Sequence, residues 1–174
     1  MDRQYPPASG GGTDASRRGS NDFLLMTGQP GLLGLSDGSI STLAPVFAAA
    51  LSTGSSHVTL LVSLAAAIGA AISMAVSEAL SDDGKLTGRG APWRRGLITG
   101  AGTLLGGSMH SLPFLIPQFR VALTVAIVVV AIELVAIAWV RWRFFPSVSV
   151  SSSLVQVTVA GALVFAVGLF LGSS

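Results

Sequence analysis

Long apolar stretches separated by short polar ones fill the chain after its first 30 residues. A helix that crosses a bilayer needs about 20 mostly apolar residues. Five segments meet that length, at about residues 32–53, 57–80, 96–116, 119–140 and 152–172. The connections between them are too short for a soluble domain. The pattern therefore predicts an all-α, polytopic membrane protein with five transmembrane helices, forming one domain over residues 31–174.

The first 30 residues have a different composition. They begin "MDRQYPPASGGGTDASRRGSND", which is rich in Gly, Ser, Pro and charged side chains and lacks the apolar core of a signal peptide. Such a composition cannot bury a hydrophobic core. We expect residues 1–30 to form a disordered cytoplasmic tail, serving either regulation and sorting or simply as a solvated leader.

Positive charges predict the orientation of the helices. Lys and Arg are enriched on the cytoplasmic side of membrane proteins. With the N-terminus inside, the cytoplasmic side carries Arg3, Arg17, Arg18, Lys85, Arg89, Arg94, Arg95, Arg141 and Arg143, and the opposite side carries only Arg120. This bias predicts an N-terminus in the cytoplasm and a C-terminus outside. Trp93, Trp139 and Trp142 fall at the predicted cytoplasmic interface, where indole rings accumulate.

Composition agrees with a membrane location. The chain is 51% hydrophobic and 10% charged, whereas soluble domains carry roughly 25% charged residues. It contains no cysteine, which excludes disulfides, zinc–thiolate sites, iron–sulfur clusters and thiol catalysis. The basic residues flank apolar segments and form no patch with interleaved aromatics, so membrane lipid, and not nucleic acid, is the expected partner.

Small residues and one proline shape the predicted helices. The second span contains "AAAIGAAISMA", the third is rich in glycine, and the fifth ends with Gly168 and Gly172 at GxxxG spacing. Such faces let helix backbones approach closely, which predicts a compact bundle and a face for self-association. Pro45 lies inside the first span and predicts a kink there, with Ser or Thr side chains or water satisfying the freed carbonyl.

Three side chains of the first two spans are candidate metal ligands. Asp37 lies about 8 Å along the first helix from its predicted entry at Leu32, and Glu78 lies within about one turn of the same surface. Met74 precedes Glu78 by four residues, so both share one helix face. We predict that the three converge at one depth, although snorkelling of the two acids to the headgroups is the alternative. Their small neighbours favour an inward, packed face.

The chemistry of this set suits a transported cation. Carboxylate oxygen binds hard or borderline divalent ions and thioether sulfur adds softness, which favours Fe(II) or Mn(II) over Mg(II). Buried carboxylates also accept protons when a metal leaves, which is a basis for metal–proton exchange.

Two further residues rank lower as metal candidates. Glu133 lies well inside the fourth span, where it is either a proton-relay group or a hydrogen-bonding partner for a neighbouring Ser or Thr. His110 lies toward the outer end of the third span, where it serves either ion exit and protonation or interfacial hydrogen bonding.

Several stretches resemble the vacuolar iron transporter family. The family's first helix begins with an S-D-G motif, as in "GLSDGSISTLAPVFAAA", and its second carries a small-rich run followed by Met and, four residues later, Glu, as in "AAAIGAAISMAVSEALS". "APWRRGLITGAGTLLGGSMHSLPFL" and "VTVAGALVFAVGLFLG" are similar to its third and fifth helices. The resemblance covers roughly residues 31–174.

The resemblance implies a homodimer with an ion path near its two-fold axis, lined by Asp37, Met74 and Glu78. It implies export of Fe2+ or Mn2+ from the cytosol by proton antiport, with no bound cofactor. The membrane would be the plasma (inner) membrane in a bacterium, or a vacuolar or other endomembrane in a eukaryote. The segment "SDDGKLTGRGAPWRR" is too short for the family's Glu-rich cytosolic metal-binding domain and contains no Glu. The chain thus resembles the short form, in which metal collection is absent or supplied by a partner.

Two other classes of function compete with transport. A membrane scaffold or assembly subunit would use the same acids for helix packing. An intramembrane enzyme of the aspartyl type is disfavoured, because the chain lacks paired aspartates on neighbouring helices. We therefore expect a transporter and not an enzyme, and a scaffold differs from it by showing no metal phenotype.

Overall fold

The computed structural model describes residue 19 and residues 22–85, 87–144 and 149–173. Their regular structure is entirely helical, so the all-α prediction is confirmed for this part of the chain. The elements are the π-helix η1 (Leu24–Gly28), α2 (Gln29–Ser41), α3 (Leu43–Thr53), α4 (Ser56–Ser81), α5 (Pro92–Met109), the 3-10 helix η2 (Leu112–Leu115), α6 (Phe119–Phe144) and α7 (Val150–Ser173). Most of the predicted tail lies outside the described residues, but Leu24–Gly28 is already helical.

Four helices in the described part are long and apolar enough to cross a membrane. They are Leu24–Thr53, Ser56–Ser81, Phe119–Arg143 and Leu154–Ser173. The predicted span at 96–116 is helical only to Met109 and continues as the short helix η2. Because α5 carries Arg94 and Arg95 in its first turn and several glycines after them, it does not reach the same apolarity. Its role as a fifth span, and the orientation of the bundle, stay predictions.

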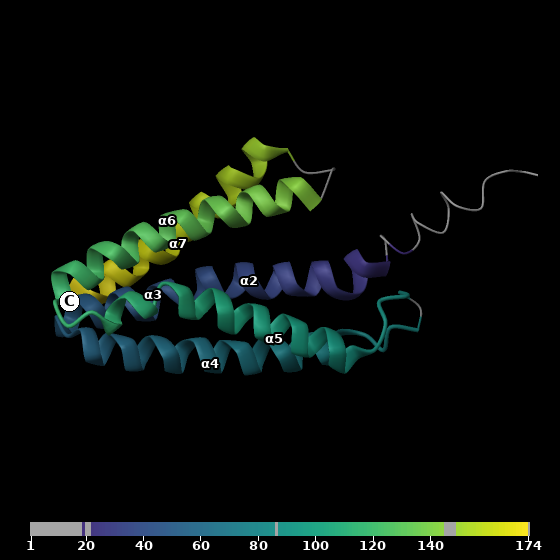
Figure 1. The fold of residues 1–174 in the computed structure, drawn as a ribbon, viewed down its shortest axis with the longest axis horizontal. Coiled ribbons are helices and arrows are strands. Elements are labelled where there is room, and N and C mark those ends of the chain that lie inside the picture. The colour runs from purple at the N-terminus through teal and green to yellow at the C-terminus, as the bar shows by residue number, and fades with distance from the viewer. Residues whose placement is uncertain (1–18, 20–21, 86, 145–148, 174) are drawn as a thin grey trace, which may run out of the picture.

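Helix α5 lies between α2 and α4, and α3 lies between α4 and α7 (Figure 1). Helices α6 and α7 pair with each other, contact the bundle at the α3 end and diverge from α2 toward its beginning (Figure 1). The start of α2 and the C-terminal end of α7 lie at opposite ends of the molecule (Figure 1).

Small residues bring α5 into contact with both neighbours. Gly34 and Gly38 of α2 lie so close to the α5 backbone that a Cβ atom at either position would overlap it. On the other side, a Cβ atom at Gly100 would be 2.8 Å from the Cβ of Ala75 in α4. Close backbone approach of this kind is how helices associate in membranes, and it confirms the compact bundle.

The GxxxG pair of the last helix is used inside the chain. Cβ atoms at Gly168 and Gly172 would lie 2.9 Å from the Ala44 carbonyl oxygen and 2.9 Å from the Leu51 Cβ of α3. This face of α7 is therefore covered by α3 and is not free for the self-association that its spacing predicted.

Pro45 produces the predicted break in the first span. Helix α2 ends at Ser41 and α3 begins at Leu43. Proline has no N–H, and its ring crowds the carbonyl four residues earlier, which here belongs to Ser41. At the break, the Thr42 hydroxyl donates to the Gly38 carbonyl at 2.7 Å. A threonine side chain thus satisfies the Gly38 carbonyl at the break, whereas a Ser, Thr or water partner for the Ser41 carbonyl stays a prediction.

Candidate functional site

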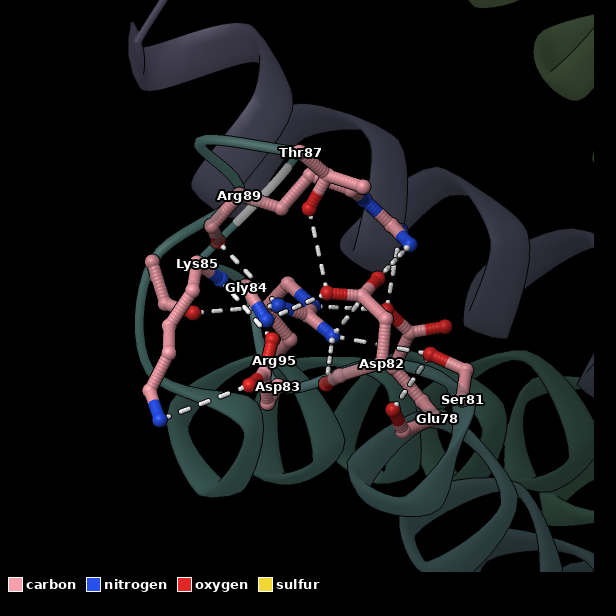
Figure 2. Close-up of polar contacts among 10 residues, drawn as sticks. Glu78, Ser81, Asp82, Asp83, Gly84, Lys85, Thr87, Arg89 and Arg95 are labelled. Atoms are coloured by element: carbon pink, nitrogen blue, oxygen red, sulfur yellow. Dashed lines mark hydrogen bonds and ion pairs between the residues drawn. The ribbon is translucent and has the colours of Figure 1, made fainter.

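Buried ionic side chains gather at two places in the described part of the chain. The first, the Glu78 cluster, joins the end of α4 to the following loop and the start of α5, and consists of Glu78, Asp82, Arg89 and Arg95 (Figure 2). Glu78 Oε1 accepts hydrogen bonds from Arg95 Nε and from Arg89 Nη2, each at 2.9 Å. Glu78 is 7% exposed, and its negative charge is paired with the two arginines inside the protein.

Arg95 is the centre of this cluster. Its side chain is 1% exposed, and a charge buried to that extent must be paired and hydrogen-bonded. Besides Glu78, its guanidinium donates to the Gly90 carbonyl at 3.1 Å. It also donates to the Asp82 carbonyl at 3.1 Å (Figure 2). One buried cation therefore holds the α4–α5 loop against both helices.

Asp82 completes the cluster from just beyond α4. Desolvation acts to raise the pKa of its carboxyl, but hydrogen bonds from the Gly84 N–H, the Thr87 hydroxyl and Arg89, together with the positive charge of Arg95, lower the pKa below its ordinary value. Arg89 Nη1 and Asp82 Oδ2 are 3.1 Å apart. Asp82 thus stays ionised and the charges of the cluster stay balanced.

The second group, the His110 cluster, joins three helices: Thr42 at the α2–α3 break, His110 at the end of α5 and Glu133 in the middle of α6. His110 Nε2 lies 2.9 Å from Thr42 Oγ1, and His110 Nδ1 lies 2.9 Å from Glu133 Oε2. His110 is fully buried and Glu133 is 5% exposed. Glu133 Oε1 is buried with no hydrogen-bond partner in the described part of the chain.

The order hydroxyl–imidazole–carboxylate resembles that of a nucleophilic triad. Thr42 is 1% exposed, however, and directs its hydroxyl hydrogen to the Gly38 carbonyl. The hydroxyl is therefore not presented to a substrate, and the cluster is better understood as a buried chain of hydrogen bonds.

The structure brings together His110 and Glu133, the two lower-ranked metal candidates. It pairs Glu78 with arginines and not with the predicted Asp37 and Met74. His110 and Glu133 bind each other, with Glu133 bonded to an imidazole instead of a Ser or Thr. Asp37 and Met74 are half-buried on α2 and α4. Among the described residues, no hydrogen bond or ion pair links Asp37 to Met74 or Glu78, and no three His, Cys, Asp or Glu side chains group as a metal site.

Packing on α5 sets the relative depth of Asp37 and Met74. Their neighbours Gly38 and Ala75 lie opposite Thr103 and Gly100 of α5. These two positions are three residues apart, which is about 4.5 Å along a helix. Asp37 and Met74 therefore lie within about one turn of each other in depth, and their convergence on one metal ion stays a prediction.

Sequence reasoning used Arg89 and Arg95 only as orientation signals and did not identify Thr42. A usable signal for the arginines was an acid at the end of one span followed by basic residues just before the next. For Thr42 the signal was Pro45, because a hydroxyl at a proline-induced break is well placed for hydrogen bonding.

Comparison with models of known families, with curated proteins and with solved structures finds no match for this chain. Inference of function therefore starts from the two clusters and from the acids that lie within the apolar helices.

Proposed function

We propose that this protein is a secondary transporter that moves a divalent metal ion, Fe2+ or Mn2+, out of the cytosol in exchange for protons. The observation that carries the proposal is the set of ionisable groups within the apolar bundle: Glu133 and His110 fully or almost fully buried, and Asp37 half-buried. Such groups are costly at membrane depth and mark ion pathways and proton relays.

Asp37 and Met74 are the metal ligands in this proposal. Asp37 has no hydrogen-bond or ion-pair partner among the described residues, so its carboxylate is free to bind a cation. A carboxylate with a thioether at similar depth suits Fe(II) or Mn(II). Glu78 adds a second carboxylate only when Arg89 and Arg95 release it, so the Glu78 cluster corresponds to a state closed on that side.

Helix α5 serves as the fifth span in this proposal. Its glycine-rich faces contact α2 and α4 and not lipid, so a lower apolarity is compatible with a membrane location. The basic end of the bundle, with Lys85, Arg89 and Arg94, faces the cytoplasm. A homodimer, as the family resemblance implies, would use surfaces other than the glycine faces that are covered within the chain.

A membrane scaffold is the second candidate. The observation that favours it is the Glu78 cluster, because Glu78 is engaged by two arginines as a purely structural acid would be.

Metal uptake into proteoliposomes separates the two candidates. We expect the unmodified protein to transport Mn2+ and Fe2+. Asp37→Asn should reduce uptake by at least about 10–100-fold, because losing a group that only orients a metal ligand already costs that much. Met74→Leu keeps the volume, removes the sulfur and should reduce Fe2+ uptake by less. Asp83→Asn is the matched control, since Asp83 is an exposed acid paired only with Lys85 at 3.6 Å. Metal uptake equal to that of protein-free vesicles would contradict transport and leave the membrane scaffold as the remaining candidate.

A further inference from the structure

The hydrogen-bond pattern of the His110 cluster fixes where its hydrogens lie. A carbonyl oxygen can only accept, so the Thr42 hydroxyl must donate its one hydrogen to Gly38 across their 2.7 Å contact. Toward His110, 2.9 Å away, Thr42 Oγ1 is then an acceptor. His110 Nε2 must therefore carry a hydrogen.

That assignment determines the proton count at the other ring nitrogen. His110 Nδ1 and Glu133 Oε2 are 2.9 Å apart, so one hydrogen lies between them. Either the imidazolium donates to a carboxylate, or a carboxylic acid donates to the neutral imidazole. Both forms contain the same number of protons and have a net charge of zero. A net-neutral pair is also the form that burial favours, because an unpaired buried charge is costly.

We propose that Glu133 and His110 form a proton-binding site that takes up and releases one proton, with Thr42 as its hydroxyl switch. When the pair loses one proton to water, a carboxylate and a neutral imidazole remain. The hydrogen between His110 and Glu133 stays on Nδ1, which must donate to the carboxylate, so the proton that is lost comes from Nε2. The Thr42 hydroxyl then turns its hydrogen from Gly38 to Nε2, and no electrons are transferred.

This site gives the proposed antiport a physical basis. Proton loss makes the pair negative and leaves the Gly38 carbonyl, one residue from Asp37, without its hydroxyl donor. Both changes favour the binding of a cation near α2. Metal binding and proton binding therefore oppose each other. Proton binding itself does not depend on transport, whereas its coupling role rests on the proposed function.

Few other charges lie near this site in the described residues. Helix α3 and the described part of α7 carry no titratable side chain. Asp37 is five residues, or about 7.5 Å along the helix, from Thr42. On α4, Ala67 faces Gly107 of α5, so in this antiparallel pair the level of His110 falls near residue 64, and His57 lies about seven residues, or about 10 Å, from that level along α4. The remaining charged groups of the surrounding helices lie eight or more residues, at least about 12 Å, from the contact level on their own helices; they are Glu78 of α4, Arg94 and Arg95 of α5, and Arg120, Arg141 and Arg143 of α6. Asp37 and His57 are therefore the nearest additional titratable groups.

Nitrogen NMR of His110 tests the site directly. The chain has two histidines, so His57→Gln leaves His110 as the single imidazole in bilayer nanodiscs. Infrared spectra report at the same time whether Glu133 is a carboxylic acid. At neutral pH we expect either an imidazolium with a carboxylate or an Nε2–H imidazole with a carboxylic acid. Raising the pH should convert His110 to the Nδ1–H tautomer. A neutral Nδ1–H imidazole beside an ionised Glu133 at neutral pH and below would overturn the proposal.

Matched variants assign the effect to the cluster. Glu133→Gln keeps the shape and an N–H donor for Nδ1, and should abolish the titration while His110 remains the Nε2–H tautomer. Thr42→Ser should preserve the tautomer change. Thr42→Val removes the hydroxyl that accepts from Nε2–H before proton loss and donates to Nε2 after it, so its pH response should differ from that of Thr42→Ser. An unchanged titration in Glu133→Gln contradicts the proton-binding site.

Proteoliposomes with an internal pH dye test coupling separately. In the unmodified protein, metal entry should drive proton movement, and Glu133→Gln should lose that movement. If the NMR titration is present but the unmodified protein moves no metal, the proton site stands and the proposed transport fails. If Glu133→Gln still exchanges metal for protons, the coupling role is wrong.

Discussion

At the scale of single residues, the main feature is how buried charges are compensated. Arg95 has almost no exposed surface, and its donors reach Glu78, Asp82 and backbone carbonyls of the loop. Breaking a buried ion pair by removing one partner is strongly destabilising, whereas replacing both partners is much less so. Variants of the Glu78 cluster therefore test whether the ion pairs of Glu78 stabilise the folded protein.

We expect Arg95→Met to lower the free energy of unfolding by about 3 kcal/mol, at the low end for a broken buried pair because Glu78 keeps Arg89. The double variant Arg95→Met with Glu78→Gln should recover part of that loss. Thermal unfolding in detergent measures both. Lys85→Ala is the control, since its pair with Asp83 is exposed and worth about 0–1 kcal/mol. Equal losses in the single and double variants would mean that the Glu78–Arg95 pair is not coupled.

At the scale of elements, α5 organises the molecule. It separates α2 from α4 and contacts both through positions where only glycine fits. Its last residues place His110 between Thr42 and Glu133, and its first residues place Arg95 beside Glu78. Any displacement of α5 therefore disturbs both clusters together.

A substitution at the α2–α5 contact tests this role. Gly38→Ala places a methyl group on the Thr103 backbone and should destabilise the protein by about 1–3 kcal/mol, as overpacking does. Gly69→Ala on α4 is the matched control, because its Cβ atom has no neighbour within 4 Å and alanine favours the helix. Thermal unfolding compares the two. A Gly38→Ala protein as stable as Gly69→Ala would show that the helices are not closely packed there.

At the scale of the whole molecule, the number of membrane crossings determines the position of the C-terminus. Four helices of the described part qualify as spans by length and composition. If α5 also crosses, the α5–α6 connection and the end of α7 lie on the side opposite the α4–α5 loop. If α5 does not cross, all three lie on the same side.

Single cysteines introduced into this cysteine-free chain distinguish these topologies. With five crossings and a cytoplasmic N-terminus, Gln118→Cys and Ser173→Cys should react with a membrane-impermeant maleimide in intact cells. Lys85→Cys should react only after the membrane is opened. All three residues are exposed in the structure. Thr53→Cys, at the end of α3, is outside with either four or five crossings and serves as the positive control. Protection of Gln118→Cys and Ser173→Cys would show that α5 does not cross.

The sequence by itself determined the helical segments, the apolar spans and the break near Pro45. These features follow from the length of apolar runs and from the backbone chemistry of one residue, which act locally. The apolar patterns of the first, second, fourth and fifth predicted spans correspond to helices of the right length. The third did not, because α5 carries Arg94 and Arg95 in its first turn, next to the polar loop before it, and continues with the glycines through which it contacts α2 and α4.

Only the tertiary structure decided which polar groups meet. The bonds Arg95–Glu78, His110–Glu133 and Thr42–His110 join residues 17, 23 and 68 positions apart. Such pairings depend on which helices lie side by side and on their relative shift. For α2, α4 and α5, backbone contacts at Gly34, Gly38 and Gly100 set both. Periodicity along one helix places Glu78 on a face and at a depth, but it does not say that arginines from the next loop and helix will occupy its carboxylate.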